Sequence, residues 1–336
     1  MYDLKQLFSA LFETFDGSSA DDLRRHLRTF PLAKRWNISA DYCIGDPGRP
    51  NDVYAFTLTP CKRDFSELSS RIAAALPTDL KRCSEISKSA TDFLKKPQFF
   101  HIAFIFDEKA HVFDNGPGGP TPNEVVREFT SYLVGQFRHF ERGADAIRRM
   151  EQLATEAKRK SFNRKLFQQI YLLSVFFAFC SLVIARERRV EHAWLSDQDN
   201  MTTGFDQIVW NLALETLNGI GRARKIKAPA SPIICVPTPI AELEQILKNP
   251  PEQPIMRWPE SATKPFMWFD EFIRLPDYVA GAVSAYDLKT TDVVGGSQKH
   301  IALAQDFLAS TRNLAALRVQ MKDGLQFSRI TYHKET

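Results

Sequence analysis

Four aspartates lie where a folded chain could bring carboxylates together. Asp46 follows the strand-like run ISADYCIG, Asp197 and Asp199 follow VEHAWLS, and Asp277 lies near the start of the helical run LPDYVAGAVSAYD. Strands that neighbour one another in a sheet deliver the side chains at their ends to one edge. Carboxylate oxygens are the ligands that Mg²⁺ prefers, and two such ions about 4 Å apart can cleave a phosphodiester. The pattern therefore predicts a carboxylate site for Mg²⁺ or Mn²⁺.

A structural role is the alternative for each aspartate taken singly. Aspartates after strands are common turn formers, and an aspartate in the first turn of a helix stabilises the helix dipole. Only convergence in space separates the two interpretations.

Motifs of other enzyme classes are absent. The sequence has no GxxxxGK[ST] phosphate loop, no HExxH and no GxSxG, and the glycine cluster at 116–119 lacks the strand–turn–helix context of a dinucleotide site. We therefore expect no small-molecule cofactor.

Two segments resemble a known family. LPDYVAGAVSAYDL is similar to the C-terminal Q-x-A-D-x-x-A-G helix of domain-of-unknown-function family 3800. YCIGDPGRPNDVYAFTL resembles the strand ending in Asp-Glu-Ser-Gly with which that family begins, with Asp46 at the Asp and Gly48 at the Gly. Asp197 matches an aspartate after a mid-chain strand, and Glu85 in KRCSEISKS matches an acidic position after the first helix. The order of elements fits from about residue 38 to 290.

This resemblance implies a ribonuclease-H-like, metal-dependent nuclease. Pro47 alone replaces the Glu-Ser of the first motif, and Arg274-Leu275-Pro276 replaces Gln-x-Ala in the second. The expected catalytic residues are Asp46, Asp197, Asp277 and Glu85, and the expected metal ligands are Asp46, Asp197, Asp277 and Asp199. Asp41 and Glu271 are held in reserve.

Clusters of basic residues favour a nucleic-acid partner. The run KRKSFNRK at 158–165 holds five basic residues and no acid, and RARKIK follows at 222–227. Clustered Lys and Arg attract phosphate backbones, although they are also common at solvated helix ends. The expected nucleic-acid-binding residues are Lys158, Arg159, Lys160, Arg164, Lys165, Arg222, Arg224 and Lys225.

Alternating strand and helix patterns predict an α/β fold. Strands are expected over 37–45, 52–59, 98–106 and 190–196, with helices over 121–160, 205–219, 275–287 and 298–318. The sequence thus predicts a central mixed β-sheet flanked by helices, ribonuclease-H-like, with an enlarged helical layer. An N-terminal helical segment over 1–36 precedes a domain over 37–330, with a helical insertion at about 121–188.

Composition favours a cytoplasmic protein. The 336 residues are 44% hydrophobic and 25% charged, with a net charge of +4, which is ordinary for a globular chain. The five cysteines include no CxxC pair, which argues against a disulfide framework or a zinc knuckle. The run at 170–185 carries no charge over 16 residues. It is shorter than the roughly 20 apolar residues of a membrane span, so a buried core helix is favoured.

Three hypotheses follow. The first is a two-metal nuclease. The second is a non-catalytic nucleic-acid-binding or protein-interaction component of a defence or mobile-element system. The third is a membrane-associated protein anchored by residues 170–185.

Overall fold

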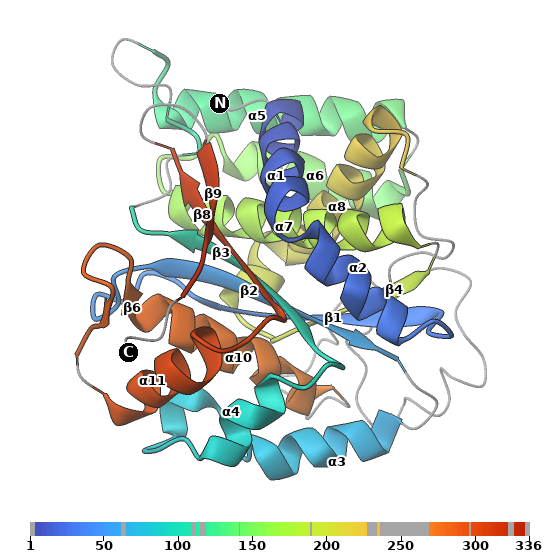
Figure 1. Cartoon of the computed structure of the whole chain (residues 1–336). Helices are drawn as coiled ribbons and strands as arrows, with labels where there is room; N and C mark the ends of the chain where they lie inside the picture. Colours follow the sequence, from blue (N-terminus) through green and yellow to red (C-terminus); the bar gives the residue numbers. More distant parts are fainter. Residues whose placement is uncertain are drawn as a thin grey trace.

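A mixed β-sheet forms the centre of the protein and carries helices on both faces (Figure 1). The structure is a computed structural model that describes residues 4–61, 65–108, 112–114, 119–140, 142–188, 190–226, 234–235, 269–295, 297–321 and 326–332. The strand order is β5-β4-β1-β2-β3-β8-β9. The α/β class and the central mixed sheet predicted from the sequence are confirmed.

The sheet has an antiparallel centre extended by parallel pairs. β2 is antiparallel to both β1 and β3, whereas β4 is parallel to β1, β5 to β4, and β8 to β3. β9 closes the far edge antiparallel to β8, and β6 and β7 form a separate ribbon. The strands are β1 Arg35–Cys43, β2 Asp52–Pro60, β3 Phe100–Phe106, β4 Glu191–Ser196, β5 Ile234–Cys235, β6 Tyr286–Asp287, β7 Asp292–Val293, β8 Leu314–Gln320 and β9 Gln326–Ile330.

Burial explains the composition of the central strands. All seven residues of β3, FHIAFIF, are buried, and so are eight of the nine in β2. A strand covered on both faces reads as a continuous apolar run because neither side meets water. Helices must therefore cover both faces of the sheet.

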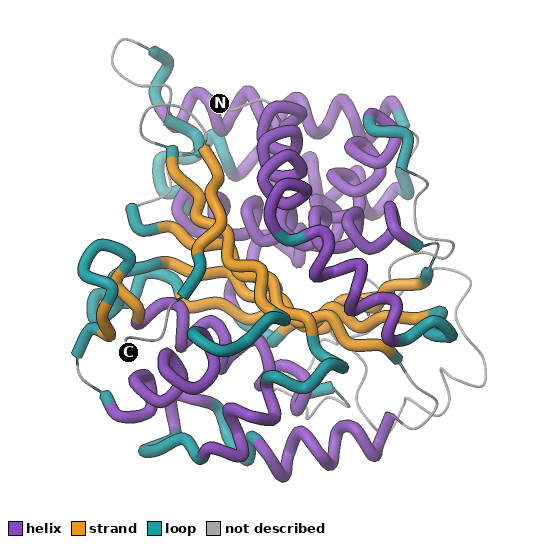
Figure 2. Tube along the Cα trace, in the orientation of Figure 1, coloured by secondary structure: helices purple, strands orange, loops and turns teal. Residues whose placement is uncertain are grey.

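The helices form two layers, visible above and below the sheet in Figures 1 and 2. One layer holds α1 Leu4–Ser18, α2 Ala20–Thr29, α5 Pro122–His139, α6 Ala144–Glu156, α7 Arg164–Glu187 and α8 Asn200–Ala223. The other holds α3 Phe65–Ala75, α4 Lys88–Leu94, α10 Asp270–Ala285, α11 Gln298–Ala302 and the π-helix Leu303–Leu308, with the 3₁₀ turn Leu80–Arg82 beside α10.

The apolar helix α7 is the core of the first layer. Sixteen of its 24 residues are buried. Phe176 stacks on Phe104 of β3 with ring centroids 4.0 Å apart, and Phe177 stacks on Trp194 of β4 at the same separation. Among the described residues, α7 is the one helix long and apolar enough to cross a membrane, but 89% of its most apolar window is buried inside the protein. The predicted core helix is confirmed.

Three predicted elements have different bounds. The helix expected over 121–160 is two helices, because the chain turns at Gly143 and α6 packs back on α5. The helix expected over 298–318 ends at Leu308, and LAALRVQ forms strand β8 instead. Burial between β3 and β9 overrides the helix propensity of its Leu and Ala residues. Helix α10 begins at Asp270, which leaves Pro276 inside the helix.

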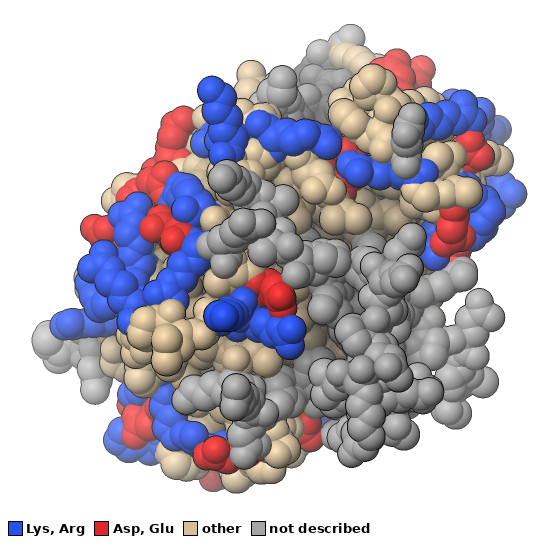
Figure 3. Space-filling view, turned by 90° about the vertical axis from the view of Figure 1, so that its right-hand side faces the viewer, with Lys and Arg blue, Asp and Glu red and all other residues tan. Residues whose placement is uncertain are grey.

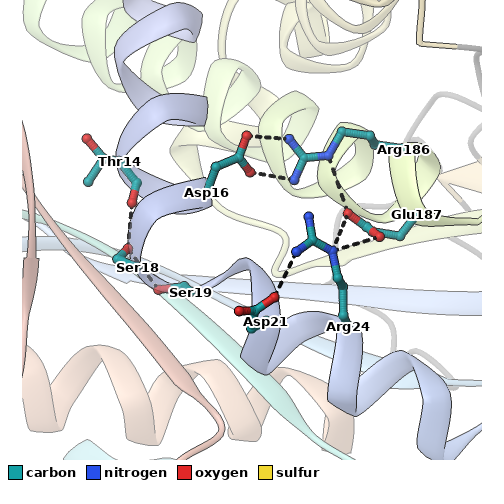
Figure 4. A network of polar contacts seen from close by, with 8 residues as sticks. All are labelled: Thr14, Asp16, Ser18, Ser19, Asp21, Arg24, Arg186 and Glu187. Atoms are coloured by element: carbon teal, nitrogen blue, oxygen red, sulfur yellow. Dashed lines mark hydrogen bonds and ion pairs between the residues drawn. The ribbon is translucent and has the colours of Figure 1, made fainter.

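Ion pairs join the N-terminal helices to the end of α7 (Figure 4). Both terminal nitrogens of Arg186 donate to Asp16 of α1, at 2.9 and 2.6 Å. Arg24 of α2 donates through Nε to Glu187, with 3.2 Å to each carboxylate oxygen. Bidentate geometry of this kind orients helices more sharply than single surface pairs do. The network therefore fixes α1 and α2 against the C-terminal end of α7.

Candidate functional site

The register of two parallel strands brings Asp41 beside Asp197. β1 and β4 pair in parallel up to Ala40 and Ser196, so Asp41 and Asp197 are the next residues along each strand. Residues in register on neighbouring strands project from the same face. Consistent with this, the Asp197 charge contributes to raising the pKa of Asp41. The carboxyl ends of two adjacent parallel strands, where ligands commonly bind in α/β proteins, thus present two carboxylates.

Helix α10 supplies a third carboxylate from Asp277. α10 packs across β1 and β2, and the side chains of Asp41 and Asp277 are hydrogen-bonded to each other. The backbone N–H of Leu80 donates to Asp277 Oδ2 at 2.6 Å. Leu80 approaches α10 closely because residue 281, four positions after Asp277, is glycine, and a Cβ atom there would overlap Leu80 Cδ2.

The proximity of these carboxyls changes their proton affinity. Burial, followed by the neighbouring Asp277 carboxyl, raises the pKa of Asp41 well above its ordinary value. Burial also raises the pKa of Asp277, against the stabilising N–H of Leu80. Two desolvated carboxyls in contact do not both ionise readily. The hydrogen bond between them therefore holds a shared proton.

Asp79 is a further acid that the sequence analysis did not single out. It precedes the 3₁₀ turn, and its charge acts to raise the pKa of Asp277. Its Oδ2 lies 3.8 Å from Arg82 Nε, and its side chain is 44% exposed. The only signal in the sequence is an Asp before a short helical turn, which is indistinguishable from an ordinary cap.

Asp199, predicted to be a metal ligand, caps helix α8. Its Oδ1 accepts hydrogen bonds from the backbone N–H groups of Met201 and Thr202, at 2.9 and 3.0 Å. Its Oδ2 accepts from the Tyr42 hydroxyl. Burial raises the pKa of Asp199 despite these donors. Both oxygens thus serve to fix the start of α8 directly after Asp197.

The other predicted acids do not reach the Asp41–Asp277 pair through their observed contacts. Asp46, half exposed in the β1–β2 loop, accepts from Gly48 N at 2.8 Å and lies 3.9 Å from Arg49 Nε. Glu85 is exposed between the 3₁₀ turn and α4. Glu271 accepts a 3.0 Å hydrogen bond from Ser69. Asp41, predicted only as a reserve ligand, is the acid of β1 that contacts Asp277.

The donor set suits a hard cation in its chemistry. Asp41, Asp197 and Asp277 offer only carboxylate oxygens, which Mg²⁺ prefers. Among the described residues, however, no group of three or more His, Cys, Asp and Glu side chains is arranged so that it could hold a metal ion as it stands. Loss of the shared proton and a rearrangement of side chains would have to accompany metal binding.

The first basic cluster lies near this end of the sheet. A hollow of about 960 Å³ opens beyond the end of β1, between the β1–β2 loop and the start of α7; Lys160, Arg164 and Lys165 line it. We call it the α7 hollow. The β1–β2 loop that forms its other side lies beside β6, at the left of Figure 1, where Asn51 donates to the carbonyl of Tyr286 at 2.6 Å.

The second basic cluster lies at the opposite end. α7 runs from beside Gly45 at the end of β1 to Glu187 near the start of β1, and α8 runs alongside it in the same direction from Asp199. There Arg224 lies over the Phe12 ring at 4.6 Å, and Arg222 lies over the Phe140 ring at 4.2 Å. On the face that includes this end, Lys and Arg are interspersed with Asp and Glu (Figure 3).

The chain matches no protein-family model, no curated protein and no solved structure. The resemblance to domain-of-unknown-function family 3800 therefore stays a prediction from short motifs.

Proposed function

We propose that the protein is a metal-dependent nuclease of ribonuclease-H-like type. Asp41 and Asp277 would hold Mg²⁺ or Mn²⁺, with Asp197 as the third carboxylate. The observation that supports this most is the hydrogen-bonded Asp41–Asp277 pair at the carboxyl ends of β1 and β4. The carboxyls of Asp41 on β1 and Asp277 on α10 meet there at a desolvation cost that a purely structural role does not need, and Asp197 follows the adjacent end of β4.

Each part of the site has a chemical role in this proposal. A bound metal would supply activation of a water molecule and charge neutralisation at a phosphodiester. The N–H of Leu80 orients Asp277, and capping by Asp199 fixes the chain that leads from Asp197 into α8. The shared proton keeps Asp41 and Asp277 together when no cation is present, and its release couples metal binding to pH.

Nuclease assays with matched variants test the proposal. Purified protein is incubated with Mg²⁺ or Mn²⁺ and labelled single-stranded DNA, duplex DNA, RNA or an RNA–DNA hybrid. Asp41→Asn and Asp277→Asn should each abolish cleavage, whereas Asp46→Asn, at a solvent-facing acid of the same strand–loop unit, should retain it. Cleavage by both Asp41→Asn and Asp277→Asn at the wild-type rate would refute the assignment.

The absence of a ready-made three-ligand group among the described residues favours a second candidate, a nucleic-acid-binding component without cleavage activity. This candidate predicts binding that is the same with EDTA and with Mg²⁺, and no heat of Mg²⁺ binding by calorimetry. A measurable heat that disappears in Asp277→Asn would exclude it.

A further inference from the structure

Many charged side chains line the α7 hollow. Most of its carboxylates have partners within the protein, whereas most of its cations form no ion pair among the described residues. Five carboxylates and four cations line it. Asp107 forms a bidentate pair with Arg318 outside the hollow, and Asp52 accepts from the backbone N–H of Gly45 at 2.6 Å. Asp46 is bonded within its own loop. Much of the negative charge is therefore taken up by donors of the protein itself.

Three of the cations are differently placed. Lys160, Arg164 and Lys165 are exposed, and within the described part of the chain none of them forms an ion pair. The guanidinium of Arg164 donates to the neutral side-chain oxygen of Asn123 at 3.1 Å. The Lys165 ammonium lies over Gly45, 3.2 Å from where a Cβ atom would stand. These three positive charges line an open hollow and are available to an anion.

A fourth cation, Arg49, lines the hollow and is held by a histidine. One of its terminal nitrogens lies 3.0 Å from Nε2 of His300. Burial, then the charges of Arg49 and Lys299, lower the pKa of His300 to about 4, so the ring is neutral at physiological pH and its Nε2 accepts from Arg49.

We propose that the α7 hollow binds the sugar–phosphate backbone of a single nucleic-acid strand. Lys160, Arg164 and Lys165 contact successive phosphates, and Arg49, held by His300, adds a fourth positive charge to the lining. The site takes a strand because the cations follow the loop before α7 and its first turn and leave the hollow open, an arrangement typical of electrostatic grooves for single strands. The position of the reacting phosphate rests on the proposed nuclease function, but the binding does not.

The chain limits the distance between the two sites. Gly45, beneath Lys165, lies four residues beyond Asp41, so their Cα atoms are at most about 14 Å apart. The three cations of the hollow contact separate phosphates, so an oligonucleotide too short to reach all three should bind weakly.

The test compares two triple variants of the full-length protein. One is Lys160→Gln/Arg164→Gln/Lys165→Gln in the hollow. The matched control, Arg222→Gln/Arg224→Gln/Lys225→Gln, removes the same amount of charge at the opposite end of α8. Fluorescence anisotropy with labelled DNA and RNA strands of about 20 nucleotides gives the affinity in EDTA at several salt concentrations, and thermal melting checks folding of both variants.

The expected result is a change in salt dependence for the hollow variant alone. Each phosphate contact contributes about 0.7 to the slope of log affinity against log salt, so three contacts account for about 2. The hollow variant should therefore lose this slope and at least tenfold in affinity at low salt, while the control keeps both. This result with either DNA or RNA supports the proposal that the α7 hollow binds a nucleic-acid strand. No binding of either strand, or equal losses in the two variants, overturns it.

The two proposals fail in different ways. If Asp41→Asn abolishes cleavage while the hollow variant binds as tightly as the wild type, the hollow is refuted and the nuclease stands. If the wild type binds through the hollow but cleaves no strand with Mg²⁺ or Mn²⁺, the nuclease is refuted and the hollow stands.

Discussion

Replacing Asp41 with asparagine should separate two effects of this carboxyl. One is its effect on the free energy of unfolding without metal, and the other is its role as a metal ligand. Its pKa is raised above the ordinary 3.8, so the folded protein holds a proton that the unfolded chain releases. The resulting stability is fully present below the unfolded pKa and is lost as the pH rises through the folded pKa. Asparagine does not ionise, and its amide can still donate to Asp277. Without metal at pH 8, Asp41→Asn should be at least as stable as the wild type.

With bound metal, the wild type should be more stable than Asp41→Asn. A ligand at 100 times its dissociation constant stabilises the folded state by about 2.7 kcal/mol. At about 2.1 cal/mol/K per residue, unfolding of the 336 residues carries an entropy of about 0.7 kcal/mol/K. Saturating Mg²⁺ should therefore raise the melting temperature of the wild type by about 4 °C. Because the shared proton must leave, the apparent affinity should rise with pH by up to about tenfold per unit.

Differential scanning fluorimetry measures both effects across pH 5 to 8. The wild type should show a Mg²⁺-dependent shift that grows with pH, whereas Asp41→Asn should show less than about 1 °C at any pH. Equal Mg²⁺ shifts in the two proteins would refute the role of Asp41 as a ligand. A variant that melts well below the wild type at pH 8 without metal would refute the argument from the buried carboxyl.

Two further predictions concern the structure around the site. Phe176→Ala removes a fully buried ring that stacks on Phe104, so it should lower the free energy of unfolding in urea by about 3–5 kcal/mol, and a loss below 1 kcal/mol would contradict a core role for α7. Asp199→Ala removes the cap of α8 and should cost about 0.5–2 kcal/mol while retaining the Mg²⁺-dependent shift in melting temperature. Loss of that shift in a folded Asp199→Ala protein would support the predicted role of Asp199 as a metal ligand.

Hydrophobic pattern was sufficient for most of the sheet but not for β8. The strands from β1 to β4 have β-branched or aromatic apolar runs bounded by turn formers, so local composition and burial agree. LAALRVQ consists largely of good helix formers and follows a helix, so nothing local marks its start as a strand. This segment becomes a strand because residues 101–105 at the edge of β3 offer it hydrogen-bond partners, and because its side chains are buried there. That pairing joins segments some 200 residues apart, which a local window does not contain.

The choice of Asp46 over Asp41 has a similar origin. Asp46 follows a strand-like run and matches the Asp of the family's first motif, so the functional carboxylate was predicted in the turn after β1. The structure shows that pairing of β1 with β4 stops at Ala40, although β1 continues to Cys43 along β2. Asp41 therefore lies within the pairing of β1 with β2 but beyond the end of the pairing of β1 with β4. Only the register between two strands about 150 residues apart reveals this.

The position of α7 explains why the two ends of the molecule differ. Its apolar middle is buried against the sheet, so its charged ends must emerge at opposite edges. At the end of α7 that lies near the start of β1, Arg186 forms an ion pair with Asp16 and Glu187 forms one with Arg24. At the carboxyl end of β1, no described acid pairs with Lys160, Arg164 and Lys165, which instead line the α7 hollow. A helix chosen only for core packing would gain from ion pairs at both ends, so the unpaired end is the one where an anionic ligand is expected.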